Sequence, residues 1–477
     1  MNYDYVFIIP FYYPGYLDEI IFAEKICEKL IENGRSTCIL IERLLSDKPP
    51  NYHKTIFTVD LHKEIEILKR SIPIDSALAE VHDKYGLYSI RNFYLTETIY
   101  KQHFKDFYSV TNDYESDDLL IKTIYTIGVI DQFLQKNNVK YFVHLNFGGE
   151  IVRRAAYCVG NKNGVKSLYF KILPIKDHFA INSNEDDIIE NLVIKKYEDL
   201  SQEEIDRAYQ YLEKFLDNKQ MISYPFTHGD NIFKRVKRKY KLDKQLGTSR
   251  TEMFCDYVLN IKHALKRPIV ASKYKQLWQS PNPSEKYVFF PLHYHKESIL
   301  TIRNQQFWKQ EWIVEYCARV LPDNYKLYVK PHPHWPYSFP YESLKQISQI
   351  SNVRLINPSS NSHDLIKKSS AVIVIASSTG FESILYQKPV VCLGKVYYRG
   401  YGLTIDVDNL WNLPNAIQMA LGTSLPEKDT IRFIAGFQSC YRGKNMFTFG
   451  PRNEKLFLDD DNISCCVDAI LDYTDKI

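Results

Sequence analysis

The sequence lacks the paired cysteines that stabilise small secreted domains. It has nine cysteines, an odd number, spread from Cys27 to Cys466 with no Cys-x-x-Cys pair. This pattern indicates reduced core residues and argues against a disulfide framework or a zinc site. We therefore expect a cytoplasmic protein.

Long apolar runs are also missing. No segment approaches the roughly 20 apolar residues that a membrane-spanning helix requires. The first apolar run, residues 5–9, stops at Pro10, and no basic cluster precedes it, so we expect no signal peptide. These absences predict a protein that is soluble or peripheral at the inner face of the plasma membrane.

A large excess of one charge is likewise missing, since the net charge is only +4 over 477 residues. This charge does not by itself indicate that the protein binds nucleic acid. The local exception is Lys234-Arg235-Val236-Lys237-Arg238-Lys239-Tyr240-Lys241, with six cations in eight residues. Two interpretations stay open: a solvated helix face, or contact with an anionic membrane at about 1 kcal/mol per basic residue. No nucleic-acid-binding module accompanies the cluster, so we expect no nucleic acid partner.

The chain is long and rich in aromatic residues. Its 477 residues exceed what one hydrophobic core usually serves, so two domains are expected. Its 36 tyrosines and 26 phenylalanines suit surfaces that hold sugars, although a general compositional bias explains them equally well.

The first half alternates predicted strands with predicted helices, which requires a parallel sheet with crossovers. The expected strands are residues 5–9, 37–41, 139–145 and 165–170, and the expected helices are residues 18–33, 127–134 and 150–159. Ser201-Gln202-Glu203-Glu204 is a capping box that opens a further helix. We expect a Rossmann-like domain over residues 1–220 with a helical insertion at about 60–121.

The second half repeats this alternation after a basic, partly helical connection at residues 221–284. The expected strands are residues 287–290, 326–329, 353–356, 371–375 and 390–393, and the expected helices are residues 305–320, 362–368 and 381–386. We expect a second Rossmann-like domain at residues 285–425 and a helical segment at 426–477. The predicted fold class is α/β, with two Rossmann-like domains facing a cleft.

Lys330-Pro331-His332-Pro333 follows a predicted strand. Its prolines stiffen the loop, so that Lys330 and His332 can donate hydrogen bonds to a phosphate without reorganising. A rigid surface turn is the other interpretation.

Ser377-Ser378-Thr379-Gly380 lies between a predicted strand and a predicted helix. Hydroxyls and free backbone N–H groups at a helix N-terminus attract anions, so we expect a phosphate site here. A capping box with Thr379 as N-cap and Glu382 reaching back is the competing interpretation. Glu382 is also a candidate to accept hydrogen bonds from ribose hydroxyls.

Pro291-Leu292-His293-Tyr294-His295-Lys296-Glu297-Ser298 leaves the first strand of the second domain. Glu297 is a candidate nucleophile or base, and His293 or His295 a donor to a sugar or phosphate. A solvated loop is the alternative.

In the first domain, Glu150 follows Gly148-Gly149 at the start of a predicted helix and is a candidate for binding or activating an acceptor hydroxyl. A carboxylate there also stabilises a helix by about 0.3–1 kcal/mol without any other role. Two acidic stretches, Asp406-Val407-Asp408 and Asp459-Asp460-Asp461, match metal-binding patterns only superficially, so we expect no metal.

Over residues 285–410 the chain resembles the bacterial capsule-polysaccharide biosynthesis family that includes the retaining Kdo transferases, which have the GT-B glycosyltransferase fold. Four stretches carry the resemblance: Pro291-Leu292-His293-Tyr294 with Glu297-Ser298, Lys330-Pro331-His332-Pro333, Ser377-Ser378-Thr379-Gly380-Phe381-Glu382 with Lys388-Pro389-Val390, and Tyr397-Tyr398-Arg399-Gly400-Tyr401-Gly402-Leu403-Thr404. The first domain matches only loosely, through residues 146–150 and Gly164-Val165.

The resemblance implies a metal-independent glycosyltransferase of capsular or lipopolysaccharide-type polysaccharide synthesis. It implies a CMP-activated sugar acid, Kdo or a related one, as donor, a glycan or glycolipid as acceptor, and no cofactor. His332 and the serines would bind the donor phosphate, and the acidic residue at Glu297 would act in catalysis. His293 stands where many members have Gln, and Glu297 where Kdo transferases tend to have Asp, so the donor and the role of Glu297 stay open.

Three alternatives stay open. A sugar-nucleotide 2-epimerase of the same architecture needs no acceptor, a teichoic-acid-like glycerophosphotransferase shares the anion site, and a glycan-binding protein without catalysis needs only the surface.

Overall fold

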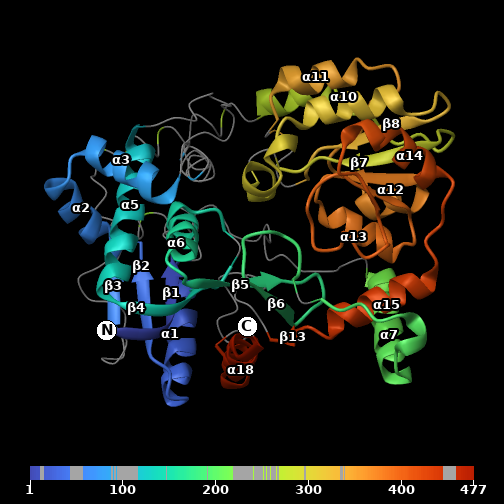
Figure 1. Cartoon of the computed structure of the whole chain (residues 1–477). Helices are drawn as coiled ribbons and strands as arrows, with labels where there is room; N and C mark the ends of the chain where they lie inside the picture. The colour runs from blue at the N-terminus through green and yellow to red at the C-terminus, as the bar shows by residue number, and fades with distance from the viewer. Residues whose placement is uncertain are drawn as a thin grey trace.

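The computed structural model describes most of the chain. The described residues are 1–10, 16–42, 57–86, 90, 93, 117–146, 148–190, 192–218, 240, 251, 254, 258, 265, 268–294, 297–333, 337, 339–443 and 458–476. Within them the chain forms two α/β domains, each built on one sheet (Figure 1).

The sheet of the first domain has the strand order β13-β6-β5-β4-β1-β2-β3. Its strands are β1 (Asn2–Ile9), β2 (Thr37–Ile41), β3 (Phe57–Asp60), β4 (Asn138–His144), β5 (Lys166–Ile172), β6 (His178–Asn182) and β13 (Tyr441–Arg442). Pairs from β3 through β5 are parallel, whereas β6 and β13 add an antiparallel edge. The side chains of β1 alternate between two cores, with Phe7 in one and Val6 in the other.

Helices cover both faces of this sheet. The core that contains Phe7 is closed by α1 (Tyr16–Glu32) and by the C-terminal helix α18 (Asp460–Lys476). The core that contains Val6 is closed by α2 (Leu61–Ser71), α3 (Ile74–Tyr85), α5 (Asp117–Lys136) and α6 (Ile151–Lys162). Within the predicted insertion, the described helices α2 and α3 pack onto α5.

The sheet of the second domain has the order β12-β11-β10-β7-β8-β9, and all its pairs are parallel. Its strands are β7 (Tyr287–Pro291), β8 (Lys326–Lys330), β9 (Val353–Leu355), β10 (Ala371–Val374), β11 (Val390–Cys392) and β12 (Ile405–Asp406). β7, β8 and β10 are buried along nearly their whole length, as expected for a parallel sheet covered on both faces.

Helices lie on both sides of the second sheet (Figure 1). The pair α10 (Gln310–Val320) and α11 (Tyr341–Ser348) covers one face, and the pair α12 (Ser362–Lys368) and α13 (Ser378–Leu385) covers the other. Between β7 and α10 the chain forms a π-helical turn, η2 (Ile299–Arg303), and a 3-10 turn, η3 (Gln305–Phe307). After β12 come the 3-10 turn η4 (Leu410–Asn412) and the helix α14 (Leu413–Leu421).

The two ends of the chain meet in the first domain. A short 3-10 turn, η1 (Tyr197–Asp199), precedes α7 (Gln202–Asn218), which packs against α15 (Glu427–Gln438). The chain then returns to add β13 and α18 to the first sheet (Figure 1). The second domain is therefore enclosed in sequence by parts of the first.

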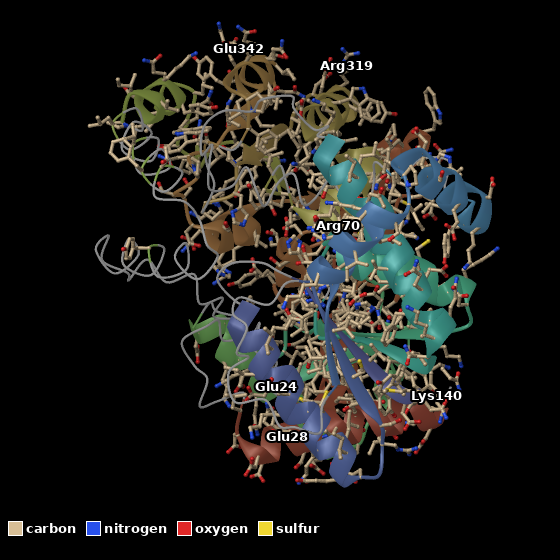
Figure 2. The ribbon with its side chains drawn as sticks, turned by 90° about the vertical axis from the view of Figure 1, so that its left-hand side faces the viewer. Glu24, Glu28, Arg70, Lys140, Arg319 and Glu342 are labelled. Atoms are coloured by element: carbon tan, nitrogen blue, oxygen red, sulfur yellow. The ribbon has the colours of Figure 1, made fainter. Side chains whose placement is uncertain are left out.

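Figure 2 shows charged side chains on outer helices, including Arg319 of α10, Glu342 of α11, and Glu24 and Glu28 of α1. The eight cysteines among the described residues are all free. Within the described part of the chain, no helix is both long enough and apolar enough to cross a membrane.

The predicted elements mostly agree with the structure. The strand at 37–41 and the helix at 362–368 have the predicted bounds, and the capping box is formed, with Ser201 N donating to Glu204 at 2.8 Å and Glu204 N to Ser201 Oγ at 3.2 Å. The helix predicted at 381–386 instead begins at Ser378. The helix predicted at 305–320 begins only at Gln310, because residues 305–307 form the 3-10 turn η3. Both differences lie in the candidate site.

Candidate functional site

The order of the second sheet reverses between β7 and β10. From β7 the chain moves outward to β8 and β9, then crosses to β10, β11 and β12 on the other side. Loops that leave two such strands at their carboxyl ends diverge and leave a crevice where open α/β sheets bind ligands. The sequences that follow β7 and β10 are those that carry His293, Glu297 and Ser377.

His293 joins these two loops. Its side chain is buried, Nδ1 lies 2.9 Å from Glu297 Oε2, and Nε2 accepts a hydrogen bond from Ala376 N at 3.3 Å. Because Nε2 is an acceptor, Nδ1 carries the proton and donates to the carboxylate. Gln310 holds the His293 backbone from α10, with Oε1 2.8 Å from the His293 N–H. The imidazole thus fixes Glu297 against the turn before α13.

Glu297 stays open to solvent, with 46% of its side chain exposed. Partial desolvation by neighbouring atoms acts to raise the pKa of Glu297. The hydrogen bond from His293 and the charges of His293, His332 and Arg303 outweigh it and hold that pKa below its usual value. His332 is therefore within electrostatic range of Glu297. An ionised, accessible carboxylate beside an imidazole suits a nucleophile or an orienting group.

Lys330 and Glu382 lie close enough for each charge to influence the ionisation of the other. Lys330 is 3% exposed, and burial lowers its pKa to about 8, although Glu382 opposes that shift. Burial raises the pKa of Glu382 to about 7, again opposed by its partner. Lys330 is therefore enclosed in the domain and does not project from a stiff loop as predicted, because it is the last residue of the buried strand β8.

The turn between β10 and α13 confirms a helix start at the predicted phosphate site. Ser377 is the N-cap, and its Oγ accepts from Thr379 N at 3.2 Å. The alternative with Thr379 as N-cap is wrong, and Glu382 is too far along the helix to reach back. Ser378 is exposed and Thr379 partly so, so both hydroxyls lie at the positive end of α13.

Tyr398 supports this turn from the next loop. Its hydroxyl donates to Ser377 O at 2.6 Å, and a Cβ at position 380 would lie 2.2 Å from the same hydroxyl oxygen. Gly380 is therefore required by the close approach of Tyr398, which explains both the glycine and the tyrosine in these motifs.

The neighbouring acidic residues are used within their own loop. Asp406 accepts from Gly400 N at 3.0 Å and from Thr404 Oγ1 at 2.5 Å, and Asp408 pairs with Arg399 at 2.5 Å. Among the described residues, no group of three or more acidic, histidine or cysteine side chains could hold a metal ion.

Glu150 lies in a buried cluster of the first domain. It precedes α6, is 4% exposed, and lies 3.0 Å from Arg153 Nε, while Arg153 also pairs with Glu19. The structure does not bring it together with Glu297 or His332 in any contact among the described residues. Its carboxylate is enclosed beside Arg153, and its role toward an acceptor hydroxyl stays a prediction.

Arg303 is a site residue that sequence reasoning missed. It lies in η2, close to Glu297, and its Nε donates to Glu185 O of the first domain at 2.7 Å. A single arginine whose partner is a backbone carbonyl has no sequence signature. The basic cluster from Lys234 to Lys241, apart from Tyr240, and the residues His295 and Lys296 lie outside the described residues.

The chain has two Rossmann-like domains. In the second, the strand order reverses between β7 and β10, and this place carries a helix N-terminus that attracts anions and the Glu297 carboxylate bound by His293. These features define a two-domain α/β protein of the GT-B type. The chain belongs to the capsule polysaccharide biosynthesis protein family, whose model matches residues 154–421. The family predicted from the motifs is thereby confirmed.

Solved structures show weaker similarity. The Thermosulfurimonas dismutans KpsC beta Kdo 2,7 transferase is 16% identical over 66% of this chain and 86% of that chain, with a TM-score of 0.32. A Methanocaldococcus jannaschii UDP-GlcNAc 2-epimerase is 13% identical over 91% and 98%, with a TM-score of 0.26. A Rickettsia africae glycosyltransferase is 10% identical over 99% and 97%, with a TM-score of 0.27. No curated protein matches.

Proposed function

We propose that the chain is a metal-independent glycosyltransferase of surface polysaccharide synthesis, which transfers a sugar from a nucleotide-activated donor to a glycan or glycolipid acceptor. Membership of the capsule polysaccharide biosynthesis family supports this role. So does the sheet topology, which provides a second domain suited to a nucleotide and a first domain available to an acceptor.

The observation that carries the proposal is the convergence at the β7–β10 crevice. Glu297 is held by His293, His293 accepts from the residue before Ser377, and His332 is within electrostatic range of Glu297. Three stretches that are far apart in sequence therefore supply a carboxylate, an imidazole and a helix N-terminus to one place.

In this proposal His332, Ser377, Ser378 and Thr379 bind the donor phosphates and stabilise the charge that develops on the departing nucleotide. Glu297 attacks or orients the anomeric carbon. Lys330 supplies a buried positive charge near Glu382, and Glu382 accepts hydrogen bonds from the ribose hydroxyls. No cofactor is required.

The finer assignments are extensions of the proposal. The donor is a CMP-linked sugar acid, Kdo or a related one, and Glu150 acts on the acceptor side of the site. The protein works in the cytoplasm or at the inner face of the membrane, where residues 234–241 contact anionic lipid.

The test is a transfer assay with CMP-Kdo and other activated sugars, with and without oligosaccharide and glycolipid acceptors. Glu297→Gln is expected to lower kcat by about 100-fold or more, because it removes the ionised carboxylate. Glu315→Gln, on the exposed side of α10, is the matched control and should retain wild-type activity. Turnover of UDP-N-acetylglucosamine without an acceptor would contradict the proposal and indicate an epimerase.

A further inference from the structure

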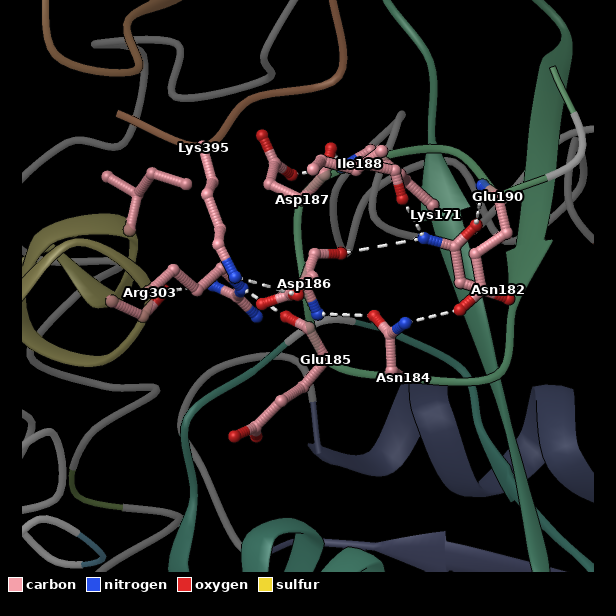
Figure 3. A network of polar contacts seen from close by, with 12 residues as sticks. Lys171, Asn182, Asn184, Glu185, Asp186, Asp187, Ile188, Glu190, Arg303 and Lys395 are labelled. Atoms are coloured by element: carbon pink, nitrogen blue, oxygen red, sulfur yellow. Dashed lines mark hydrogen bonds and ion pairs between the residues drawn. The ribbon is translucent and has the colours of Figure 1, made fainter. Parts of the chain in front are cut away.

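Arg303 connects the two domains next to Glu297. Its guanidinium donates through Nε to Glu185 O at 2.7 Å and through Nη1 to Ser298 Oγ at 3.2 Å. Figure 3 shows Arg303 reaching the loop of Glu185 and Asp186 from the second domain, beside Lys395. The Arg303 guanidinium thus contacts both Ser298, the residue after Glu297, and the backbone of Glu185 in the first domain.

The segment from Glu297 to Asn304 is internally fixed. Leu300 N and Thr301 N donate to Glu297 O at 2.9 and 3.0 Å. At its other end Asn304 accepts from Lys395 N at 2.7 Å and donates to Ile299 O at 3.0 Å. A displacement of Arg303 is therefore transmitted to the backbone that carries the Glu297 carboxylate.

The loop that receives Arg303, residues 183–190, is also fixed from its own side. Ser183 N and Oγ donate to the Glu190 carboxylate, each at 2.8 Å, and Asp187 pairs with the buried Lys171. Figure 3 shows the loop around Asn182, whose side-chain amide donates to Asp186 O and Ile188 O, with Asn184 donating to Glu190. Its carbonyls are consequently presented in one arrangement to the second domain.

We propose that Arg303 is a positioning residue that holds Glu297 in its working orientation only while the 183–190 loop of the first domain is docked. The proposal rests on the proposed function, because it assigns Glu297 to the transfer reaction. It makes the first domain a part of the catalytic geometry in addition to its role as the acceptor side.

The positive charge of Arg303 gives an effect on the pH–rate profile that separates positioning of Glu297 from a merely structural role. Glu297 is faced by His293 from its own loop, by His332 after β8 and by Arg303 from η2. Since Arg303 contributes to lowering the pKa of Glu297, removing its charge raises that pKa. The acid side of the rate profile, where Glu297 becomes protonated, should therefore move to higher pH in Arg303→Gln and stay in place in Arg303→Lys.

The experiment compares Arg303→Gln and Arg303→Lys with Lys395→Gln. Lys395 pairs with Asp186 of the same loop at 3.2 Å, but the two side chains are 54% and 42% exposed, so its loss should cost little. Both Arg303 variants should lower kcat by about tenfold or more, since neither glutamine nor lysine can contact Glu185 O and Ser298 Oγ together as the guanidinium does. Nucleotide affinity should stay unchanged within about twofold. Lys395→Gln should match wild type.

Hydrogen exchange decides the proposal even if no transfer activity is found for the wild-type protein. Arg303→Gln should increase amide exchange in residues 183–190 and 297–304 together, whereas Lys395→Gln should change neither. The proposal is overturned if amide exchange in residues 297–304 is unchanged in Arg303→Gln. It is also overturned if Arg303→Gln and Lys395→Gln have equal effects on kcat and on the acid side of the pH–rate profile.

Discussion

At the scale of single residues, the site depends on a few close approaches between the β10–α13 turn and its neighbours. Ala376 N sets the tautomer of His293, and Tyr398 leaves no room for a side chain at position 380. Each of these contacts joins residues far apart in sequence. The positions of the motif residues at strand ends were therefore predictable, while their exact partners were not.

Gly380→Ala tests this residue-scale packing. The added Cβ would lie 2.2 Å from Tyr398 Oη, so the turn or the ring must shift, at a cost of about 1–3 kcal/mol. We expect a lower melting temperature and weaker nucleotide binding, measured by thermal unfolding and calorimetry.

Gly422→Ala is the matched control, because the nearest atom to its Cβ would be 3.7 Å away. Equal stability and equal nucleotide affinity for the two variants would contradict the role assigned to Tyr398.

At the scale of elements, two helices distant in sequence, α1 and α18, share one face of the first sheet. Ile470 of α18 is fully buried in the core that also contains Phe7 and Ile26. Sequence patterns predicted a helical C-terminal segment but not its place, because an amphipathic helix does not specify which apolar face it covers.

Ile470→Ala should lower the free energy of unfolding by about 2–5 kcal/mol, since it leaves a cavity in this core. Cys465→Ala, at an exposed position of the same helix, should leave stability unchanged. Denaturant unfolding measures both. If the two variants were equally stable, α18 would not be an integral part of the first domain.

Glu24, on α1, gives the element scale a pH dependence. Burial and the adjacent Glu28 raise its pKa to about 7, and Figure 2 shows the two residues on the same helix. Because the folded-state pKa is raised, this residue's contribution to stability is full below its unfolded pKa, near 4.5, and is lost as pH rises through about 7.

Glu24→Gln should therefore increase stability at pH 8 by on the order of 1 kcal/mol relative to wild type, and have little effect at pH 4. Thermal unfolding at the two pH values measures the difference. A gain of equal size at both would show that ionisation of Glu24 is not the cause.

At the scale of the whole molecule, the alternation of strands and helices predicted both α/β domains, because a parallel sheet leaves few other topologies. It did not predict β6 or β13, whose two-stranded edge is completed by residues more than 250 positions apart. Nor did it predict Arg303, because its partner is the backbone of Glu185. Contacts between domains depend on the assembled fold, whereas strand-end motifs are local.

The most direct measurement of the central claim is calorimetric titration of CMP, CDP, UDP and GDP into wild-type protein and into His332→Ala, with His62→Ala on the exposed face of α2 as control. If the β7–β10 crevice is one nucleotide-phosphate site, a single nucleotide class binds, His332→Ala weakens it by about tenfold or more, and His62→Ala does not. Binding of none of the four, or unchanged affinity in His332→Ala, would contradict it.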